Sequence, residues 1–559
     1  MNAASHIKRL DQRPLKESIL RKNKTRIFGF DSDEIIRKFF FGNAAVAVVV
    51  LGLITFSLFR EGLGFFPQHW QSMVVYRQAG LEYVDYVRDQ HTAHGMLLRN
   101  LQRIRQEKTA DLKARGVDPA RIATRMAPLS SLLRDFDEAV IPLDALLRDM
   151  TTTAAGIKER WTNRQNEALA YKNNPAGEKA PGEEINLLAE VAQVRAFQSR
   201  YEEVNQAFSI RLREISAVLP ITNDADTDAK LRKFQSGVNR YVQSFPDTES
   251  RMRKWNPARE VGTFEALTAF ILGPKWVTQS FWQDWYGFLP LFVGSLSISF
   301  TALLVAVPFG VGAAIYINQL AGPTEARLIK PYIEFISAIP SVVLGFFGIA
   351  VLGETIRWLT QGAPLTESVL ATWPSWTHGL LGIFHSVLAP LVKWVPFFPI
   401  SERLNIMTAG LLLALMAVPT IFTLSEDALN NVPRAFKEAS YALGANRLQT
   451  IVRIIVPAAL SGIISAVLLG FGRVIGETMV VLMCAGNRIQ IPDFTQGLGA
   501  LFLPVHTMTG IIAQEVPEVP KGVLQYRALF MLAIMLFLIS LAINYVAQLI
   551  VKRYRISVG

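Results

Sequence analysis

Apolar runs long enough to cross a bilayer place the strongest constraint on how this chain folds. A helix needs about 20 apolar residues to cross roughly 30 Å of hydrocarbon. The sequence holds six such runs, at about Phe39–Phe59, Leu291–Ile317, Ile333–Leu352, Ile406–Leu424, Ala458–Ala485 and Leu529–Val551. Of the 559 residues, 50% are hydrophobic and 18% are charged, which is unusual for a soluble protein of this length. The sequence therefore predicts an all-α membrane protein with about six transmembrane helices.

The first run, predicted as an anchor helix over residues 39–60, follows a basic segment over residues 1–38. This lead is too long for a cleaved signal peptide, and no small-residue cleavage site follows the run. We expect an uncleaved anchor with its N-terminus in the cytoplasm. Six spans then return the C-terminus to the cytoplasm and place residues 61–288 on the other side of the membrane.

The formal net charge of +11 raises the possibility of nucleic-acid binding. Much of the excess lies in the N-terminal segment and in the last residues, Lys552, Arg553 and Arg555. Charges that flank apolar spans orient them in a bilayer. We therefore expect membrane lipid rather than nucleic acid as the partner of these charges.

Residues 61–288 are polar and carry a helical pattern. From Leu188 to Leu219 the apolar residues recur every three or four positions, which predicts one long helix or coiled coil ending at Pro220. Two further periodic stretches cover about Gln71–Arg115 and Pro128–Asn173. We expect an elongated helical insert that serves as a spacer or docking surface, with no chemistry of its own.

The sequence offers few candidates for a metal site or a disulfide. His91 and His94 are three residues apart, but no Cys or other His lies near them, so no metal site is predicted. The one cysteine, Cys484, excludes an intramolecular disulfide. The short, interrupted apolar stretch at residues 379–397 is predicted to be an interfacial or re-entrant hairpin.

The segment at residues 425–457 is predicted to be a cytoplasmic loop of two short helices. Pro433 suits the first turn of a helix, and Gly444 is a typical helix stop. The sequence contains no G-x-x-x-x-G-K-[ST] motif, which excludes a P-loop ATP site and predicts no bound cofactor.

This loop resembles the EAA motif of binding-protein-dependent ABC importer permeases. The matching positions are Glu438, Ala439, Ser440, Gly444, Ile454 and Pro457, with Ser440 and Val456 replacing the usual Ala and Leu. In that family the motif forms a coupling helix that docks in a groove of the ATP-binding subunit. The resemblance implies a type I ABC importer permease core over residues 289–559 and a non-enzymatic role. It implies two kinds of partner, namely an ATPase dimer, which would bind ATP and magnesium, and a second related permease. It also implies a bacterial inner membrane. An amphipathic helix lying on the membrane is the alternative.

The last half of the chain resembles the phosphate-importer permeases. The similar stretches are Ser297–Ile317, Glu334–Leu352, Ser425–Ala445 and Gly470–Asn487. The sequence GETM followed by Asn487 resembles the PstC-type subunit more than the PstA-type, which usually reads GETAP. The resemblance implies phosphate as the solute and a periplasmic phosphate-binding protein as a further partner. It does not extend to the insert.

Two charges interrupt the apolar run GFGRVIGETMVV. A charge at mid-bilayer is costly, so Arg473 should face protein or a water-filled cavity. Glu477 lies four residues on, which on a continuous helix places it on the same face. The pair predicts an anion pathway in which the guanidinium binds phosphate oxygens. A purely structural ion pair is the alternative.

Small residues in the spans complete the candidate set. Gly470, Gly472 and Gly476 predict close packing against another helix. Ser297 and Thr301 are four residues apart and are candidates for the pathway, although such hydroxyls commonly bond the backbone four residues back.

We conclude that the sequence predicts an ABC importer permease subunit, most consistent with import of inorganic phosphate. Two other functions stay open. One is a permease for a different oxyanion or solute. The other is a membrane-anchored sensor or scaffold whose helical outer domain binds a partner.

Overall fold

The computed structural model describes residues 26–27, 30–175, 180, 182–220, 224–278, 280, 282–356 and 402–554. Most of the basic segment and the predicted hairpin at 379–397 lie outside these residues. The chain forms two compact units, residues 1–61 and residues 62–559, and each is described by itself.

The first unit consists of a small hairpin and one long helix. Strand β1 (Arg26–Ile27) pairs antiparallel with β2 (Phe30–Asp31), and helix α2 (Ser32–Leu63) follows at once. Helix α2 extends beyond the predicted anchor at both ends. Its side chains from Phe39 to Phe56 are largely exposed and mostly apolar, as expected for a helix in lipid.

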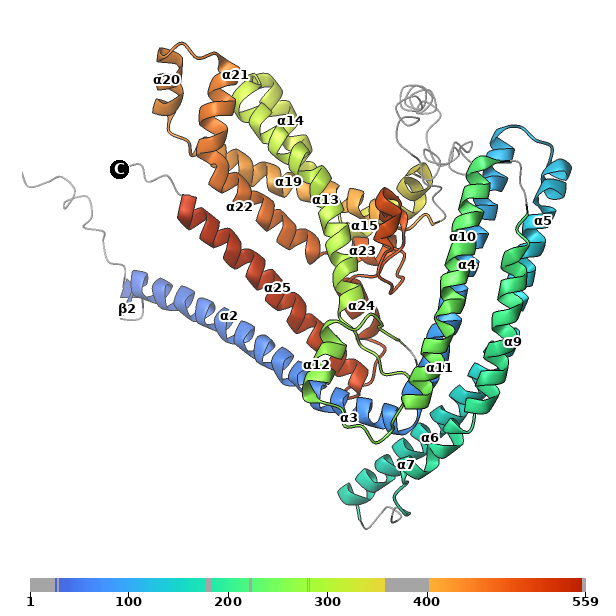
Figure 1. The fold of residues 1–559 in the computed structure, drawn as a ribbon. Coiled ribbons are helices and arrows are strands. Elements are labelled where there is room, and N and C mark those ends of the chain that lie inside the picture. Colours follow the sequence, from blue (N-terminus) through green and yellow to red (C-terminus); the bar gives the residue numbers. More distant parts are fainter. Residues whose placement is uncertain are drawn as a thin grey trace, which may run out of the picture. The chain divides into compact units, whose positions relative to one another are not determined.

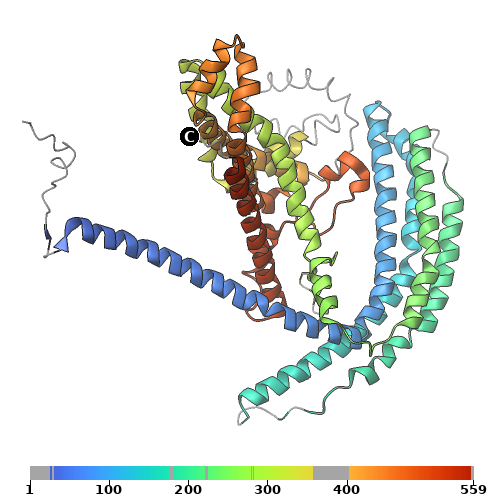
Figure 2. The same ribbon diagram turned by 60° about the vertical axis from the view of Figure 1, so that its left-hand side comes forward.

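The second unit begins with a bundle of helices that forms the insert (Figures 1 and 2). These helices are α3 (Phe65–Gln78), α4 (Leu81–Ala114), α5 (Pro119–Glu138), α6 (Ile141–Asn173), α7 (Leu187–Glu190), α8 (Ala192–Arg195), α9 (Gln198–Ala217), α10 (Ala225–Gln243), α11 (Phe245–Lys254) and α12 (Thr263–Ile271). The prediction of an additional helical region is confirmed.

The prediction of one long helix over Leu188–Leu219 is wrong in detail. The segment is divided into α7, α8 and α9, because tight turns interrupt the helical hydrogen bonding: the amide of Val194 donates to the carbonyl of Val191, and that of Phe197 to Val194. Most of the apolar stripe is still buried, as at Val191, Val194 and Leu212, whereas Leu188 is 46% exposed. The stripe therefore packs into the core although the helix is interrupted between α7, α8 and α9.

The two other predicted helical stretches are also divided. Gly80 separates α3 from α4 in a left-handed conformation with φ of 83°, which glycine adopts without steric cost. Ala139 and Val140 separate α5 from α6. The periodic patterns thus predicted the helices but not the positions at which they are interrupted.

A buried histidine lies at the centre of the insert. The ring of His94 stacks on Phe136 with 4.3 Å between centroids, and its Nε2 donates to the Phe136 carbonyl at 3.0 Å. Its Nδ1 is buried without a hydrogen-bond partner in the described structure. Burial lowers the pKa of His94 from 6.5 to about 4, so the ring is neutral at pH 7. His91 instead lies 3.6 Å from Asp144, so the two rings face different surroundings.

We expect the insert to lose stability as the pH falls from 6.5 towards 4. In this window the unfolded chain protonates His94 and the folded chain does not, which costs about 2 to 3 kcal/mol by pH 4.5. Thermal unfolding of the full chain in detergent at pH 7 and pH 4.5 measures the effect. The His94→Phe variant keeps the stacking but cannot titrate, so its melting temperature should fall less. An equal fall in both proteins would contradict this account.

The remaining helices form the membrane core. They are α13 (Leu289–Ile315) with the π-helix η1 (Tyr316–Leu320), α14 (Pro323–Ser337), α15 (Ser341–Phe347) with the π-helix η2 (Gly348–Leu352), α19 (Ile406–Asn430), α20 (Arg434–Ala442), α21 (Arg447–Thr450) with the π-helix η3 (Ile451–Ile455), α22 (Val456–Ile475), α23 (Met479–Cys484), the 3₁₀ helix η4 (Phe494–Phe502), α24 (Met508–Glu515) and α25 (Leu524–Tyr554). Among the described residues, five helical segments are long and apolar enough to span, or six if α14 and α15 form one span. The prediction of about six spans is confirmed.

Two predicted spans are not straight helices. The span predicted at Ile333–Leu352 bends by 91° between α14 and α15, next to Pro340. The span predicted at Ala458–Ala485 is broken between α22 and α23. There the Glu477 carboxylate accepts the amide of Met479 at 3.2 Å, which replaces a hydrogen bond within a continuous helix.

Small residues bring α13 and α19 close together. A Cβ atom on Gly410 of α19 would lie 2.7 Å from the Thr301 methyl group of α13. Ala302, Ala306 and Ala409 are fully buried in the same contact. Such residues let two helix backbones approach and pack tightly in a membrane.

The link between α12 and α13, residues 272–288, fastens the insert to the core. Asp284 accepts hydrogen bonds from Lys158 and from Ser72, the latter at 2.7 Å. Lys275 pairs with Asp89 at 2.5 Å. The described insert and the start of α13 are therefore joined by ionic contacts as well as by the chain.

Candidate functional site

The predicted coupling loop at residues 425–457 forms a compact helical hairpin. Helix α20 ends at Ala442, and Gly444, two residues beyond, has φ of 79°. The amide of Gly444 donates to Tyr441 and that of Ala445 donates to Ser440, at 2.9 and 3.2 Å. This pattern satisfies carbonyls at the end of a helix and requires a left-handed residue. The predicted bend is therefore built on a glycine.

A buried hydroxyl pair closes the hairpin. Ser440 Oγ lies 2.9 Å from Thr450 Oγ1, and both side chains are buried. Alanine, the usual residue of the motif at position 440, could not make this bond. Ser440, which replaces the usual alanine, thus stabilises the hairpin in this chain.

Basic side chains attach the hairpin to the end of α13. Arg447 Nε donates to the Gln319 carbonyl at 3.0 Å, and its Nη2 donates to Leu320 at 3.3 Å. Lys437 also contacts the Gln319 side chain, at 3.3 Å. Carbonyls at a helix C-terminus lack partners within the helix and favour cations. Movement of the hairpin would therefore be transmitted to α13 as well as to α22.

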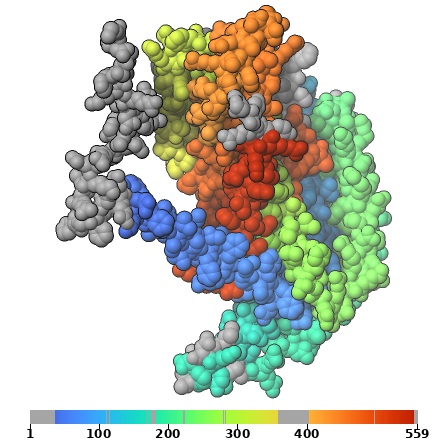
Figure 3. All heavy atoms as spheres, turned by 90° about the vertical axis from the view of Figure 1, so that its left-hand side faces the viewer, coloured from blue at the N-terminus to red at the C-terminus, as the bar shows by residue number. Residues whose placement is uncertain are grey.

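The outer surface of the hairpin is apolar and hollowed. Leu443 and Leu448 are 89% and 66% exposed. A groove of about 490 Å³ lies beside them, and Ala439, Gly444 and Ile454 are among its lining residues. In Figure 3 this part of the chain lies at the molecular surface in orange. An exposed apolar knob beside a groove is suited to docking against another protein.

The other two predicted coupling residues are both exposed. Glu438 is exposed on α20, and Pro457 is exposed in the first turn of α22. No ion pair to Glu438 is found within the described part of the chain. Its role in coupling stays a prediction.

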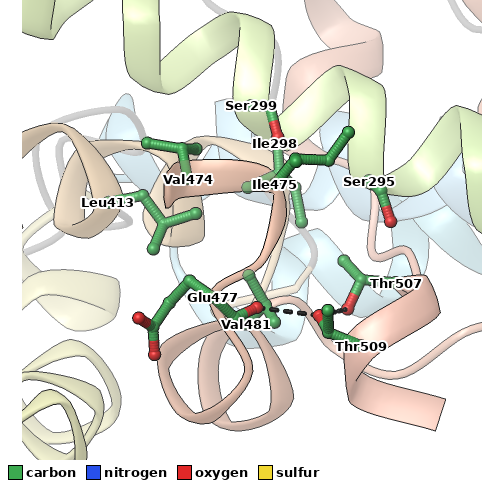
Figure 4. Close-up of a pocket in the computed structure, with 10 residues that line it drawn as sticks. All are labelled: Ser295, Ile298, Ser299, Leu413, Val474, Ile475, Glu477, Val481, Thr507 and Thr509. Atoms are coloured by element: carbon green, nitrogen blue, oxygen red, sulfur yellow. Dashed lines mark hydrogen bonds between the residues drawn. The ribbon is translucent and has the colours of Figure 1, made fainter. Parts of the chain in front are cut away.

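A narrow polar crevice lies where α13, α19, α22, α23 and α24 meet (Figure 4). It is lined by Ser295, Ile298, Ser299, Leu413, Val474, Ile475, Glu477, Val481, Thr507 and Thr509. The crevice has no room for a water molecule in this conformation. It is therefore a closed polar seam in an apolar core.

The hydroxyls of the crevice are bonded to backbone at the helix breaks. Ser295 Oγ accepts the amide of Met508 at 3.0 Å, and Thr507 Oγ1 accepts that of Gly510 at 3.1 Å. Thr509 Oγ1 donates to the Glu477 carbonyl at 2.8 Å. These bonds hold the broken segments together, and they would have to rearrange before the hydroxyls could bind a solute.

The serine and threonine predicted for the pathway are not the ones that line the crevice. Ser297 Oγ donates to the Val293 carbonyl at 2.7 Å, and Thr301 Oγ1 donates to Ser297 at 2.9 Å. Both follow the alternative of bonding the backbone four residues back. Ser295 and Ser299 have the same spacing on the crevice face, and sequence reasoning did not select them. It also missed Thr507 and Thr509.

Arg473 and Glu477 do not form an ion pair with each other in the described structure. The expectation that both lie on one helical face is wrong, because α22 ends at Ile475. Arg473 Nη1 donates to Thr420 Oγ1 at 2.8 Å, and its side chain is exposed. Figure 4 shows the Glu477 carboxylate directed away from Thr507 and Thr509. Their roles in an anion pathway stay predictions.

The three predicted packing glycines have different surroundings. A Cβ atom on Gly470 would lie 2.7 Å from Ile421 of α19, so this glycine permits close packing within the chain. Within the described residues, no atom outside α22 lies within 4 Å of a Cβ on Gly472, and a Cβ on Gly476 would meet only the carbonyls of Gly472 and Arg473. Gly472, Arg473 and Gly476 form an uncovered surface, here called the Arg473 face.

Comparison with known proteins places the similarity in the membrane core. A family model described as "Binding-protein-dependent transport system inner membrane component" matches residues 306–556. The chain is 31% identical over 302 residues to the "Phosphate transport system permease protein PstC" of Haemophilus influenzae, which covers 54% of this chain and 87% of the relative. It is also 31% identical over 267 residues to the "Probable ABC transporter permease protein YqgH" of Bacillus subtilis, with 47% and 72% covered. A solved structure of the MetNI methionine ABC transporter is 17% identical with a TM-score of 0.29, and the match covers 47% of this chain and 93% of that one. The family match contains the coupling hairpin and excludes the insert.

Proposed function

Since the chain belongs to the binding-protein-dependent transport system inner-membrane component family, we propose that it is the permease subunit of an importer for inorganic phosphate. Its place as an ABC importer permease subunit follows from the family and from its apolar spans. The observation that carries the phosphate assignment is the 31% identity with a phosphate permease over 87% of that relative.

The described contacts support a mechanism in which motion enters at the coupling hairpin. The chain has no P-loop, so an associated ATPase dimer would bind ATP and magnesium and hydrolyse ATP. Movement of the hairpin would pass directly into α22 and, through Arg447, into α13. These helices carry Ile475 and Ser299, both of which line the crevice. Their relative movement would open the crevice, because packed helices shift as rigid elements.

The Arg473 face supports a second, related permease as the partner. A charged side chain exposed on an apolar helix is costly in lipid and is expected to face protein or water. Gly472 and Gly476 on either side leave room for another helix to approach. In a heterodimer Arg473 would lie between the two permeases, where a guanidinium could bind phosphate oxygens.

The chain would lie in a bacterial inner membrane with both termini in the cytoplasm. This orientation places the coupling hairpin beside the ATPase and the insert on the periplasmic side. A periplasmic phosphate-binding protein would deliver the anion there. The positive-inside rule supports this orientation through the basic residues near both ends of the chain.

The proposal is tested by uptake in proteoliposomes that contain the full complex with its binding protein. We expect ATP-dependent accumulation of labelled phosphate and little accumulation of sulfate or molybdate. Vesicles without ATP provide the control. Transport of sulfate or molybdate without phosphate would show that the chain serves another oxyanion.

A further inference from the structure

Helix α12 (Thr263–Ile271) is anchored to the molecule by one side only. Ala266 and Phe270 on this side are buried, with exposed fractions of 3% and 0%. The ring of Phe270 lies 5.0 Å from that of Phe65 in α3, and its carbonyl accepts the amide of Phe288, at the start of α13, at 2.7 Å. The helix is therefore held against both the insert and the first core helix.

The opposite side of α12 is apolar and uncovered. Phe264 is 74% exposed and Leu272, just beyond the helix, is 61% exposed, and Leu267 and Ile271 are each 36% exposed. These four large side chains form the outer face of α12. A helix that is apolar on both sides gains little from facing water.

An ionic contact fixes which side faces outward. Glu265 accepts a hydrogen bond from Arg77 at 2.7 Å, and the Arg77 side chain is only 7% exposed. Arg77 also pairs with Glu82 of α4 at 2.6 Å. Rotation of α12 about its axis would remove Glu265 from the buried Arg77 guanidinium and so lose a charge-assisted hydrogen bond.

We propose that the outer face of α12 lies in the boundary between lipid headgroups and acyl chains. The helix is bonded to the start of α13, whose exposed residues Leu296, Phe300 and Leu304 form an apolar stripe at four-residue spacing. The outer face of α12 therefore belongs to a helix that is bonded directly to the start of a lipid-facing span. A short helix with an apolar outer face and a polar edge is typical of segments that lie in a membrane interface.

An aromatic residue beside α12 supports the same assignment. Trp70 of α3 is 42% exposed, and its indole N–H donates to the Val261 carbonyl at 2.8 Å. Trp is enriched at the membrane interface, where its apolar ring and its polar N–H are both accommodated. Through α12 and Trp70, the insert would rest on the bilayer at a fixed height.

The single cysteine of the chain makes the proposal directly testable. Cys484 is buried and is replaced by serine, after which Phe264→Cys and Leu272→Cys are made separately and labelled with a nitroxide. The matched control is Ile210→Cys on α9, an apolar residue of the insert that is 50% exposed. The full-length variants are placed in phospholipid nanodiscs. Electron paramagnetic resonance then measures collisions with oxygen, which concentrates in lipid, and with a water-soluble nickel chelate.

We expect the ratio of oxygen to nickel collisions at positions 264 and 272 to exceed that at position 210 several-fold. A ratio equal to that of the control would overturn the proposal, because the outer face would then lie in water. Labels that are immobilised and shielded from both reagents would also overturn it. In that case another protein segment, such as the anchor helix or a second subunit, covers the face. Unchanged thermal unfolding of each variant verifies that α12 is intact.

Discussion

Replacement of Arg473 by Gln is expected to reduce phosphate uptake by about 10- to 100-fold. Glutamine is polar but carries no charge for an anion, and it lacks the guanidinium that donates to Thr420 at 2.8 Å. A hydrogen bond to a charged group contributes about 1.5 to 3 kcal/mol, and each 1.4 kcal/mol corresponds to about a factor of ten. Initial rates of phosphate uptake in proteoliposomes measure the effect.

The matched control is Arg473→Lys, which keeps the positive charge and loses the planar fork. Its uptake should lie between the wild-type and Gln values. Co-purification of the second permease must be measured for each variant. Wild-type flux of Arg473→Gln in an assembled complex would contradict the role in the anion pathway, and failure of that variant to assemble would favour a structural role.

Replacement of Gly444 by Pro should abolish uptake and solute-stimulated ATP hydrolysis. Gly444 has φ of 79°, whereas proline is restricted to about −65°. Proline also removes the N–H that donates to Tyr441 at 2.9 Å. The backbone between α20 and α21 would therefore have to adopt another conformation, which destabilises the hairpin by about 3 kcal/mol or more. Uptake and ATPase rates of the complete complex are the readouts.

Gly444→Ala provides the graded control. Among the described residues, no atom beyond the chain neighbours lies within 4 Å of an added Cβ. The destabilisation is therefore the backbone cost of the left-handed conformation, roughly 1 to 2 kcal/mol. We expect reduced but measurable coupling. If Gly444→Pro transports normally, the chain acts as a membrane-anchored sensor or scaffold rather than as a coupled permease.

The spans could be predicted from sequence because length and hydropathy are local properties. The breaks within them could not. The run from Ala458 to Ala485 is largely apolar, and its interruption depends on the Glu477 side chain accepting the Met479 amide and on Thr509 bonding the Glu477 carbonyl. The second bond joins residues 32 positions apart. A periodic pattern contains no information about such a partner.

The choice between two serine pairs on α13 shows the same limit for the site. Ser295 with Ser299 and Ser297 with Thr301 have identical spacing, so periodicity alone cannot choose between them. Packing against α19 distinguishes the two pairs, because the Thr301 side chain packs against Gly410 of that helix. The EAA-like motif was recognisable from sequence because its geometry is local. Ser440 was noted there only as a departure, and its partner Thr450 became clear from the folded hairpin.

The break after Ile475 separates α22 from α23, so that α22 can tilt as a lever once the Thr509–Glu477 hydrogen bond rearranges. Its 20 residues span about 30 Å, so a tilt of about 10° at the Val456 end would displace Ile475 by about 5 Å. That displacement exceeds the diameter of a water molecule, about 2.8 Å. A continuous helix through residue 485 would have to carry α23 with it. Because the chain turns at Gly476, a small tilt of α22 could open the crevice while α23 stays in place.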